Sequence, residues 1–117
     1  MDLATIIAEL DLHILTDQND FSNTTPTGGY AADLLSCVMA GAPHGGIWIT
    51  LQAHINIVAV AALIELCAVI ITEGALPDAE TISKANDEGI TLLSTPLPTY
   101  AICGRLWEMG LTNYKQA

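Results

Sequence analysis

Three polar segments of this sequence combine residue types that can bind a ligand or transfer a proton, and each follows a short apolar run. They are Gln52, His54 and Asn56 after the run at 47–51, Glu73 and Gly74 after the run at 68–72, and Thr95 and Pro96 after the run at 91–94. If these runs are parallel strands, their carboxyl ends meet at one edge of a sheet, which is where ligands of α/β proteins bind. We therefore expect the three segments to form one binding rim.

His54 is the most reactive of these candidates, because an imidazole titrates near neutral pH. It lies between a predicted strand and a predicted helix, with Gln52 and Asn56 at alternate positions. Two interpretations stay open: His54 contributes to a ligand site, or it caps the helix or satisfies a neighbouring carbonyl. Glu73 is either an acid that faces the ligand or a solvated loop residue, and Asn56 can cap the helix that follows it.

A second candidate segment is Thr27-Gly28-Gly29, followed by Asp33. Adjacent glycines permit positive φ angles and a close approach of the backbone to a ligand, which suits a nest for an anion. A plain turn before a strand requires the same residues, so this interpretation also stays open. Asp33 lies within or just after the predicted strand at 30–35 and is a candidate acid. We place all four residues in the same predicted ligand pocket.

The elements that must position these residues alternate between strands and helices. The chain is expected to begin with a helix at 2–10 capped by Asp2, a short strand at 13–16 and a polar loop at 17–26. The later elements are a strand at 30–35 passing into a helical turn near Val38, strands at 47–51, 68–72 and 91–94, and helices at 56–66, 78–88 and 99–109. Such alternation is typical of crossover units. It predicts an α/β fold, three-layer α/β/α with a mostly parallel sheet, as a single domain over residues 1–117.

The predicted helix at 56–66 is apolar on nearly all sides, with Glu65 as its only charged residue. A helix that packs on one face of a sheet normally shows a polar face to water. Either the sheet and the neighbouring helices enclose this helix, or its outer face is buried against a second copy of the chain. A homodimer through the helix from Asn56 to Leu66 is therefore one expected assembly.

Composition and charge exclude several classes of protein. Of 117 residues, 51% are hydrophobic and 14% are charged, which predicts a folded chain. Lys and Arg together number 3 against 13 Asp and Glu, and a net charge of -10 has the wrong sign for nucleic acid or an anionic membrane surface. The apolar stretch at 55–71 is shorter than the ~20 residues that span a bilayer, and it contains Glu65. The first sixteen residues lack the basic region of a secretory signal, so we expect a cytoplasmic protein.

The cysteines and the absent motifs narrow the chemistry further. Cys37, Cys67 and Cys103 are widely spaced in apolar stretches, which predicts reduced, buried thiols and neither a disulfide framework nor a zinc site. The sequence contains no G-x-x-x-x-G-K-[ST], G-x-G-x-x-G, G-x-S-x-G or H-x-x-x-H motif. We therefore expect no metal and no kinase activity, and the sequence names no cofactor.

Four longer segments carry a family resemblance. They are TPTGGYAADLLS at 25–36, GGIWITLQAHINIVAVAAL at 45–63, VIITEG at 69–74 and LLSTPLPTYAICGRLWEMG at 92–110. In these segments the chain resembles the DRTGG domain family, in particular its short single-domain members. It departs from the family at Thr25-Pro26, which stand where the family name records an Asp-Arg pair, and its first hundred residues contain no arginine.

The resemblance implies a fold like that of the N-terminal domains of HPr kinase and of some Mur ligases, and a regulatory or ligand-sensing role. It does not imply kinase activity, because the phosphate-binding loop of HPr kinase belongs to a different domain. Members of the family are often encoded near iron hydrogenases and electron-bifurcating NADH-oxidising components, which implies a setting in redox metabolism. The missing Asp-Arg pair favours an uncharged ligand or a protein partner.

Together, the residues and the resemblance favour a non-enzymatic regulatory or sensor module that binds a small-molecule or nucleotide-like ligand. Two alternatives are kept. One is an adaptor that binds a redox or metabolic enzyme through its surface, without a small ligand. The other is a small enzyme that uses His54 with Glu73 or Asp33 as acid and base.

Overall fold

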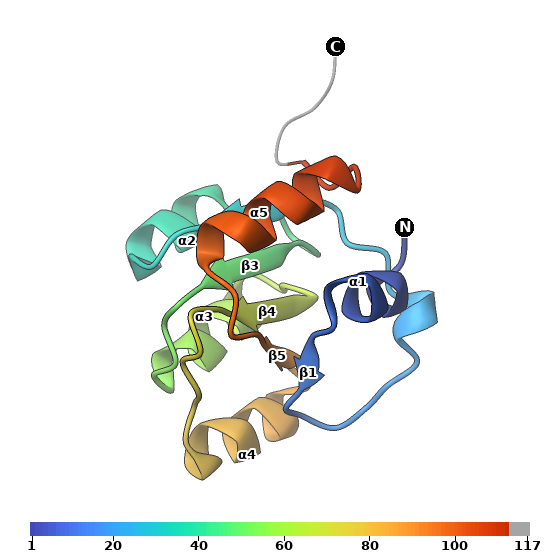
Figure 1. Cartoon of the computed structure of the whole chain (residues 1–117). Coiled ribbons are helices and arrows are strands. Elements are labelled where there is room, and N and C mark those ends of the chain that lie inside the picture. Colours follow the sequence, from blue (N-terminus) through green and yellow to red (C-terminus); the bar gives the residue numbers. More distant parts are fainter. Residues whose placement is uncertain (113–117) are drawn as a thin grey trace.

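The computed structural model describes residues 1–112, which form a five-stranded sheet covered by helices on both faces (Figure 1). The strands are β1 (His13–Ile14), β2 (Gly29–Ala31), β3 (Ile47–Thr50), β4 (Ala68–Ile71) and β5 (Leu92–Ser94). The helical elements are α1 (Leu3–Leu10), the short 3-10 helix η1 (Phe21–Asn23), α2 (Leu35–Gly41), α3 (Asn56–Leu63), α4 (Ala79–Glu88) and α5 (Thr99–Glu108). Strands and helices alternate from β2 onward, as the apolar runs predict.

The strand order is β1-β5-β4-β3-β2. β2, β3, β4 and β5 are parallel to one another, and β1 pairs with β5 in the antiparallel direction. Each parallel connection passes through one helix, because a chain that re-enters a sheet in the same direction must cross over its face. The predicted three-layer α/β/α fold with a mostly parallel sheet is confirmed.

Alternate residues of the central strands enter two separate cores. Ile49 and Ile70 pack in the core that α1 and α5 cover, whereas Trp48 and Val69 pack in the core under α2, α3 and α4 (Figure 1). Because both faces of the sheet are covered, neither set of residues meets water. This is why the strands read as continuous apolar runs in the sequence rather than as alternating ones.

The starts and ends of the helices follow local rules. Asp2 accepts a hydrogen bond from the backbone N–H of Thr5 at 2.8 Å, and Asp78 accepts one from Thr81 at 2.9 Å. These bonds satisfy amides that a helix start leaves unpaired, and the first confirms the predicted cap at Asp2. Gly89 ends α4 in the left-handed conformation with φ 70°, which glycine adopts without steric cost.

The helix predicted at 56–66 ends earlier than expected, at Leu63. Glu65 adopts the left-handed conformation with φ 56°, and the N–H of Leu66 donates to the carbonyl of Ala61 at 3.0 Å. This bond closes the last turn and directs the chain into β4. The predicted helix is therefore correct in type and too long at its C-terminus.

The strand predicted at 30–35 is wrong over residues 32–35. β2 ends at Ala31, and α2 begins at Leu35. Between them, the carboxylate of Asp33 bonds the loop after β3, so the chain leaves the sheet instead of extending β2. The helical turn expected near Val38 is confirmed as α2.

α3 lies between α2 and α4 on one face of the sheet. Its buried residues are Ile57, Val58, Val60 and Ala61. The exposed residues form a narrow stripe of Asn56, Ala59 and Leu63. Elements of the same chain therefore enclose most of this apolar helix, and a homodimer through it stays a prediction.

The cysteines differ from one another in their surroundings. All three are free, but Cys37 is exposed on α2, so the prediction of buried thiols is wrong for that residue. Cys67 and Cys103 are partly buried. Desolvation raises the pKa of Cys67 to about 12, and it also raises the pKa of Cys103.

Among residues 1–112, none of the helices is long and apolar enough to cross a membrane.

Trp48 offers a test of the packing on the α3 face. Its side chain is fully buried, and its indole Nε1 donates to the carbonyl of Ala32 at 2.7 Å. Trp48→Ala should lower the free energy of unfolding by about 3–5 kcal/mol, because it leaves a large cavity in the core. Trp107→Ala is the matched control, since Trp107 is half exposed, and it should cost less. Urea unfolding of both variants measures the difference, and equal losses would contradict this description of the core.

The three thiols should react in a fixed order. Iodoacetamide at neutral pH should label Cys37 first and Cys67 last, because the thiolate is the nucleophile and burial suppresses it at Cys67. Intact-protein and peptide mass spectrometry over time measures the order. Labelling in urea is the control, since all three cysteines should then react alike. Fast labelling of Cys67 in the folded protein would contradict its burial.

Candidate functional site

The carboxyl edge of the parallel strands is built on a row of buried threonines. Thr50, Thr72 and Thr95 come at or directly after the ends of β3, β4 and β5. The hydroxyl of Thr72 donates to the carbonyl of Thr50 at 3.3 Å and also contacts the hydroxyl of Thr99, at the start of α5. The hydroxyl of Thr95 accepts the N–H of Leu97 at 3.2 Å. The hydroxyl of Thr72 therefore links the ends of β3 and β4 to the start of α5, and that of Thr95 holds the loop after β5.

Asp33 joins the loop after β2 to the loop after β3. Its Oδ1 accepts the hydroxyl of Thr50 at 2.7 Å and the N–H of Leu51 at 3.0 Å. The side-chain amide of Gln52 donates to the backbone carbonyl of Asp33 at 3.2 Å. Asp33 and Gln52 are therefore brought together at this edge, as the sequence predicts.

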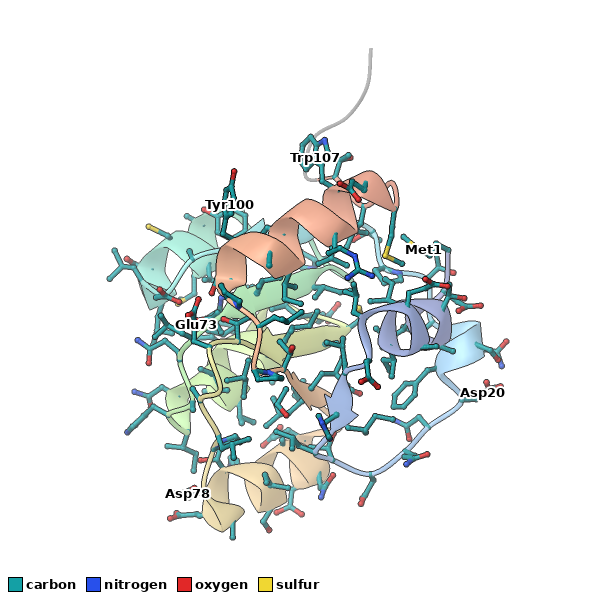
Figure 2. All side chains as sticks on the ribbon, in the orientation of Figure 1. Met1, Asp20, Glu73, Asp78, Tyr100 and Trp107 are labelled. Carbon is teal, nitrogen blue, oxygen red and sulfur yellow. The ribbon has the colours of Figure 1, made fainter. Side chains whose placement is uncertain are left out.

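Glu73 joins the loop after β4 to the first turn of α5 (Figure 2). It adopts the left-handed conformation with φ 62°, which is uncommon for a residue other than glycine. Its N–H donates to the carbonyl of Leu97 at 2.9 Å, and its Oε2 accepts the N–H of Thr99 at 2.7 Å. A carboxylate at a helix N-terminus interacts favourably with the helix dipole. Glu73 thus has a structural partner and is exposed at the same time.

His54 takes the capping role that was left open for it. Its Nδ1 accepts the N–H of Asn56 at 3.2 Å. Asn56 is the first residue of α3, and its side chain does not cap that helix, so the expectation that Asn56 is the cap is wrong. Hydrogen bonds from the backbone N–H and the hydroxyl of Thr81 lower the pKa of Asp78, at the start of α4, and the nearby imidazole of His54 acts more weakly in the same direction.

A cavity of about 390 Å³ opens at the same edge, beside β5. It is lined by His13, Leu15, Gly74, Ala75, Leu76, Ser94, Thr95 and Pro96. The volume lies within the range of ~300–1,000 Å³ that is typical of small-molecule sites, and a mostly apolar lining with a few polar groups is typical as well. Three residues that the sequence placed on this rim line the cavity, namely Gly74, Thr95 and Pro96.

Thr27, Gly28 and Gly29 lie at the opposite edge of the sheet, so the expectation of one shared rim is wrong for them. Gly28 accepts the N–H of Ile47, the first residue of β3, at 2.9 Å. The segment precedes its strand, whereas the other candidates follow theirs, and in a parallel sheet these two positions are at opposite ends. These three residues therefore do not line a common pocket with His54 and Glu73.

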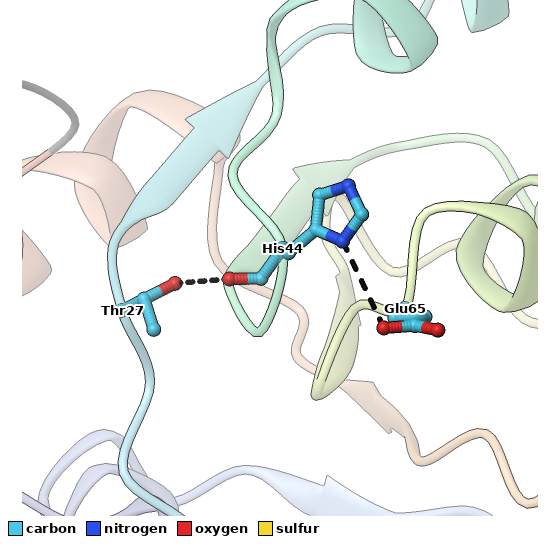
Figure 3. A network of polar contacts seen from close by, with 3 residues as sticks. All are labelled: Thr27, His44 and Glu65. Atoms are coloured by element: carbon cyan, nitrogen blue, oxygen red, sulfur yellow. Dashed lines mark hydrogen bonds and ion pairs between the residues drawn. The ribbon is translucent and has the colours of Figure 1, made fainter.

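The contacts of this opposite edge are structural (Figure 3). The hydroxyl of Thr27 donates to the carbonyl of His44 at 2.6 Å, and Nδ1 of His44 lies 3.7 Å from Oε2 of Glu65. Neither Gly28 nor Gly29 has a positive φ, so the anion nest expected from the glycine pair does not form. Gly29 is instead extended in β2. A Cβ added at Gly29 would lie 3.5 Å from the side chain of Leu111, which is an ordinary contact distance.

The charge of the carboxyl edge is negative. Asp33, Glu73 and Asp78 lie there and are exposed. The two basic side chains within residues 1–112 bond elsewhere: Lys84 pairs with Glu88 at 3.4 Å, and Arg105 donates to the backbone of Glu9 at 3.2 Å. Within the same residues, no group of three or more His, Cys, Asp or Glu side chains is placed to hold a metal ion.

Comparison with known proteins supports the fold. No protein-family model and no curated protein matches the sequence. Among solved structures, the fold is similar to the CBS and DRTGG domains of the regulatory region of Clostridium perfringens pyrophosphatase, determined in complex with its activator, diadenosine tetraphosphate. The TM-score is 0.71 at 20% sequence identity, and the match covers 87% of this chain and 44% of that chain. The chain thus has a DRTGG-like fold and spans less than half of that regulatory region.

Sequence reasoning missed His13, Leu15 and Leu76 as lining residues. His13 reaches the cavity because β1 pairs with β5 and places it opposite Ser94, a contact between positions far apart in the chain. No local pattern predicts that pairing. The threonine row did have a signal, because Thr50, Thr72 and Thr95 each follow an apolar run of the sequence.

Asp78 provides a test of the electrostatics at this edge. Its hydrogen bonds from Thr81 lower its pKa, so the folded state favours the carboxylate. The stabilisation is therefore complete above the ordinary aspartate pKa of about 3.9 and is lost as the pH falls through the lower folded-state pKa. Asp78→Ala should lower the melting temperature at pH 7, and the difference from the unmodified protein should shrink at acidic pH. Asp87→Ala, an exposed acid on the same helix, should show neither effect in calorimetric scans across this pH range.

Proposed function

We propose that this protein is a non-enzymatic regulatory domain that binds a small ligand at the carboxyl edge of its sheet. The observation that carries the proposal is the cavity of about 390 Å³ lined by Gly74, Leu76 and Thr95. It lies where parallel sheets bind ligands, and the loops around it are held by side-chain hydrogen bonds. A preformed recess on a rigid edge suits binding without large rearrangement.

The fold gives further support. The similar pyrophosphatase region is described as regulatory and in complex with a nucleotide activator. On this basis we propose membership of the DRTGG domain family and a nucleoside- or nucleotide-like ligand for this chain. The sequence resemblance at 25–36 and 92–110 points to the same family. The link to redox metabolism rests on the resemblance alone.

In this arrangement, each candidate reacting group of the small-enzyme alternative accepts a hydrogen bond that holds a loop or a helix start. Nδ1 of His54 accepts the N–H of Asn56, Oδ1 of Asp33 accepts two hydrogen bonds, and Oε2 of Glu73 accepts the N–H of Thr99. No hydrogen bond joins His54 to Asp33 or Glu73 in these contacts. The three side chains position loops, and this favours a binding domain over a catalytic one.

The adaptor alternative is favoured by one feature of α5. Its outer face exposes two aromatic residues about two helical turns apart, Tyr100 at 90% and Trp107 at 50% (Figure 2). Exposed aromatic side chains are enriched in protein interfaces. Capture of one stoichiometric enzyme partner by the unmodified protein, lost in Tyr100→Ala, would favour the adaptor if no small molecule changes the melting temperature.

The ligand site can be tested with matched leucine variants. Nucleosides and nucleotides should be screened for an increase in melting temperature, because a ligand that binds only the folded state stabilises it. Leu76→Ala should weaken the binding of any compound found, since Leu76 lines the cavity. Leu63→Ala is the control, because Leu63 is as exposed as Leu76, at 66% against 67%, and lies at the end of α3 outside the cavity lining. Equal effects of the two substitutions would contradict the location of the site.

A further inference from the structure

We propose that the cavity beside β5 recognises the base of a nucleoside or nucleotide, and that His13 and Ser94 are the residues that hydrogen-bond to this base. The inference rests on the proposed function, and it names both the part of the ligand that is recognised and the side chains that contact it. It starts from two polar side chains of the cavity wall whose hydrogen-bonding groups are not used elsewhere within residues 1–112.

The three histidines differ in what their side chains contact. Nδ1 of His54 accepts the N–H of Asn56, and Nδ1 of His44 lies 3.7 Å from Oε2 of Glu65. His13 instead lines the cavity, and within residues 1–112 its imidazole takes part in no hydrogen bond or ion pair. A neutral imidazole has one nitrogen that donates a hydrogen bond and one that accepts. Both nitrogens of His13 are therefore available to a ligand in the cavity.

Ser94 lies directly opposite His13, where β1 pairs with β5. The side chains of such a cross-strand pair share one face of the sheet, with Cβ atoms about 4.5–5.5 Å apart. Ser94 lines the cavity and is only 5% exposed, and its hydroxyl has no hydrogen-bond partner among the described residues. The hydroxyl of the neighbouring Thr95, by contrast, already accepts the N–H of Leu97. His13 and Ser94 thus bring two neighbouring polar groups to one wall of the cavity.

The rest of the lining suits the flat faces of an aromatic ring. Leu15, Leu76 and Pro96 provide apolar side chains, whereas Gly74 and Ala75 leave space because they carry little or no side chain. A base combines apolar faces with donor and acceptor groups on its edges, and proteins enclose the faces and hydrogen-bond to an edge. No Lys or Arg side chain within residues 1–112 lines the cavity. The base is therefore the part of a nucleotide that this wall matches.

The two polar groups also explain how the site would discriminate between ligands. A compound that fills the cavity without bonding to the Ser94 hydroxyl takes water away from this group and offers no hydrogen bond in return, which costs free energy. Sites of this kind reject a compound that lacks the matching donor or acceptor more strongly than an apolar pocket rejects one of the wrong size. We therefore expect His13 and Ser94 to determine which base binds.

Isothermal titration of the full chain tests the inference with adenosine, guanosine, cytidine and uridine, with their 5′-monophosphates and with ribose 5-phosphate. At least one base should bind about tenfold more tightly than ribose 5-phosphate, both as the nucleoside and as the monophosphate. The tighter of these two compounds identifies the form of the ligand, and either result supports recognition of the base.

For the tightest compound, His13→Leu and Ser94→Ala should each weaken binding about tenfold, because each substitution removes hydrogen-bonding groups from the wall. His13→Gln should bind within about threefold of the unmodified protein, since glutamine keeps a donor and an acceptor. This rescue distinguishes hydrogen bonding by His13 from a role in filling space, which leucine would retain. Melting temperatures check that each variant is folded.

His44→Leu is the matched control. His44 is also exposed, but it lies at the opposite edge of the sheet near Glu65, so its replacement should leave the affinity unchanged. Binding of ribose 5-phosphate as tightly as the nucleosides, or equal affinities of the unmodified protein and His13→Leu, would overturn the inference while leaving a ligand site. Absence of binding by every compound to the unmodified protein would contradict the proposed function itself.

Discussion

Parallel pairing of β4 with both β3 and β5 is the constraint on which the rest of the structure depends. It requires each connection to cross a face of the sheet, so helices cover both faces and the strands become apolar throughout. It also brings the carboxyl ends of these strands to one edge. Loops from distant parts of the sequence therefore meet there, whatever residues they carry.

The polar residues at that edge show how such loops are held. Asp33, His54 and Glu73 each accept backbone N–H groups that would otherwise lack partners. These amides lie at loops and helix starts, and the side chains pair them where no strand or helix does. The cavity beside β5 opens at the same edge.

Part of the candidate site could be predicted from the sequence. The largest error of that prediction could also have been avoided from the sequence. Asp33 and Gln52 meet as expected, and Gly74 reaches the cavity. Thr27, Gly28 and Gly29 were assigned to the same rim, although they precede their strand and therefore belong to the opposite edge. Their glycines suggested an anion nest, but residue type alone does not distinguish a nest from an extended strand. Whether a segment stands before or after its strand was the better signal for the edge of the sheet at which it lies.

The sequence by itself determined the elements, because caps such as Asp78, left-handed ends such as Gly89 and continuous apolar runs act over a few neighbouring residues. It also determined the net charge of -10 and the absence of phosphate-binding motifs. The tertiary structure alone decided that β1 pairs with β5, that His13 reaches the cavity and that Glu73 bonds the start of α5. These contacts join residues far apart in the chain, and only the packing of the whole sheet selects them.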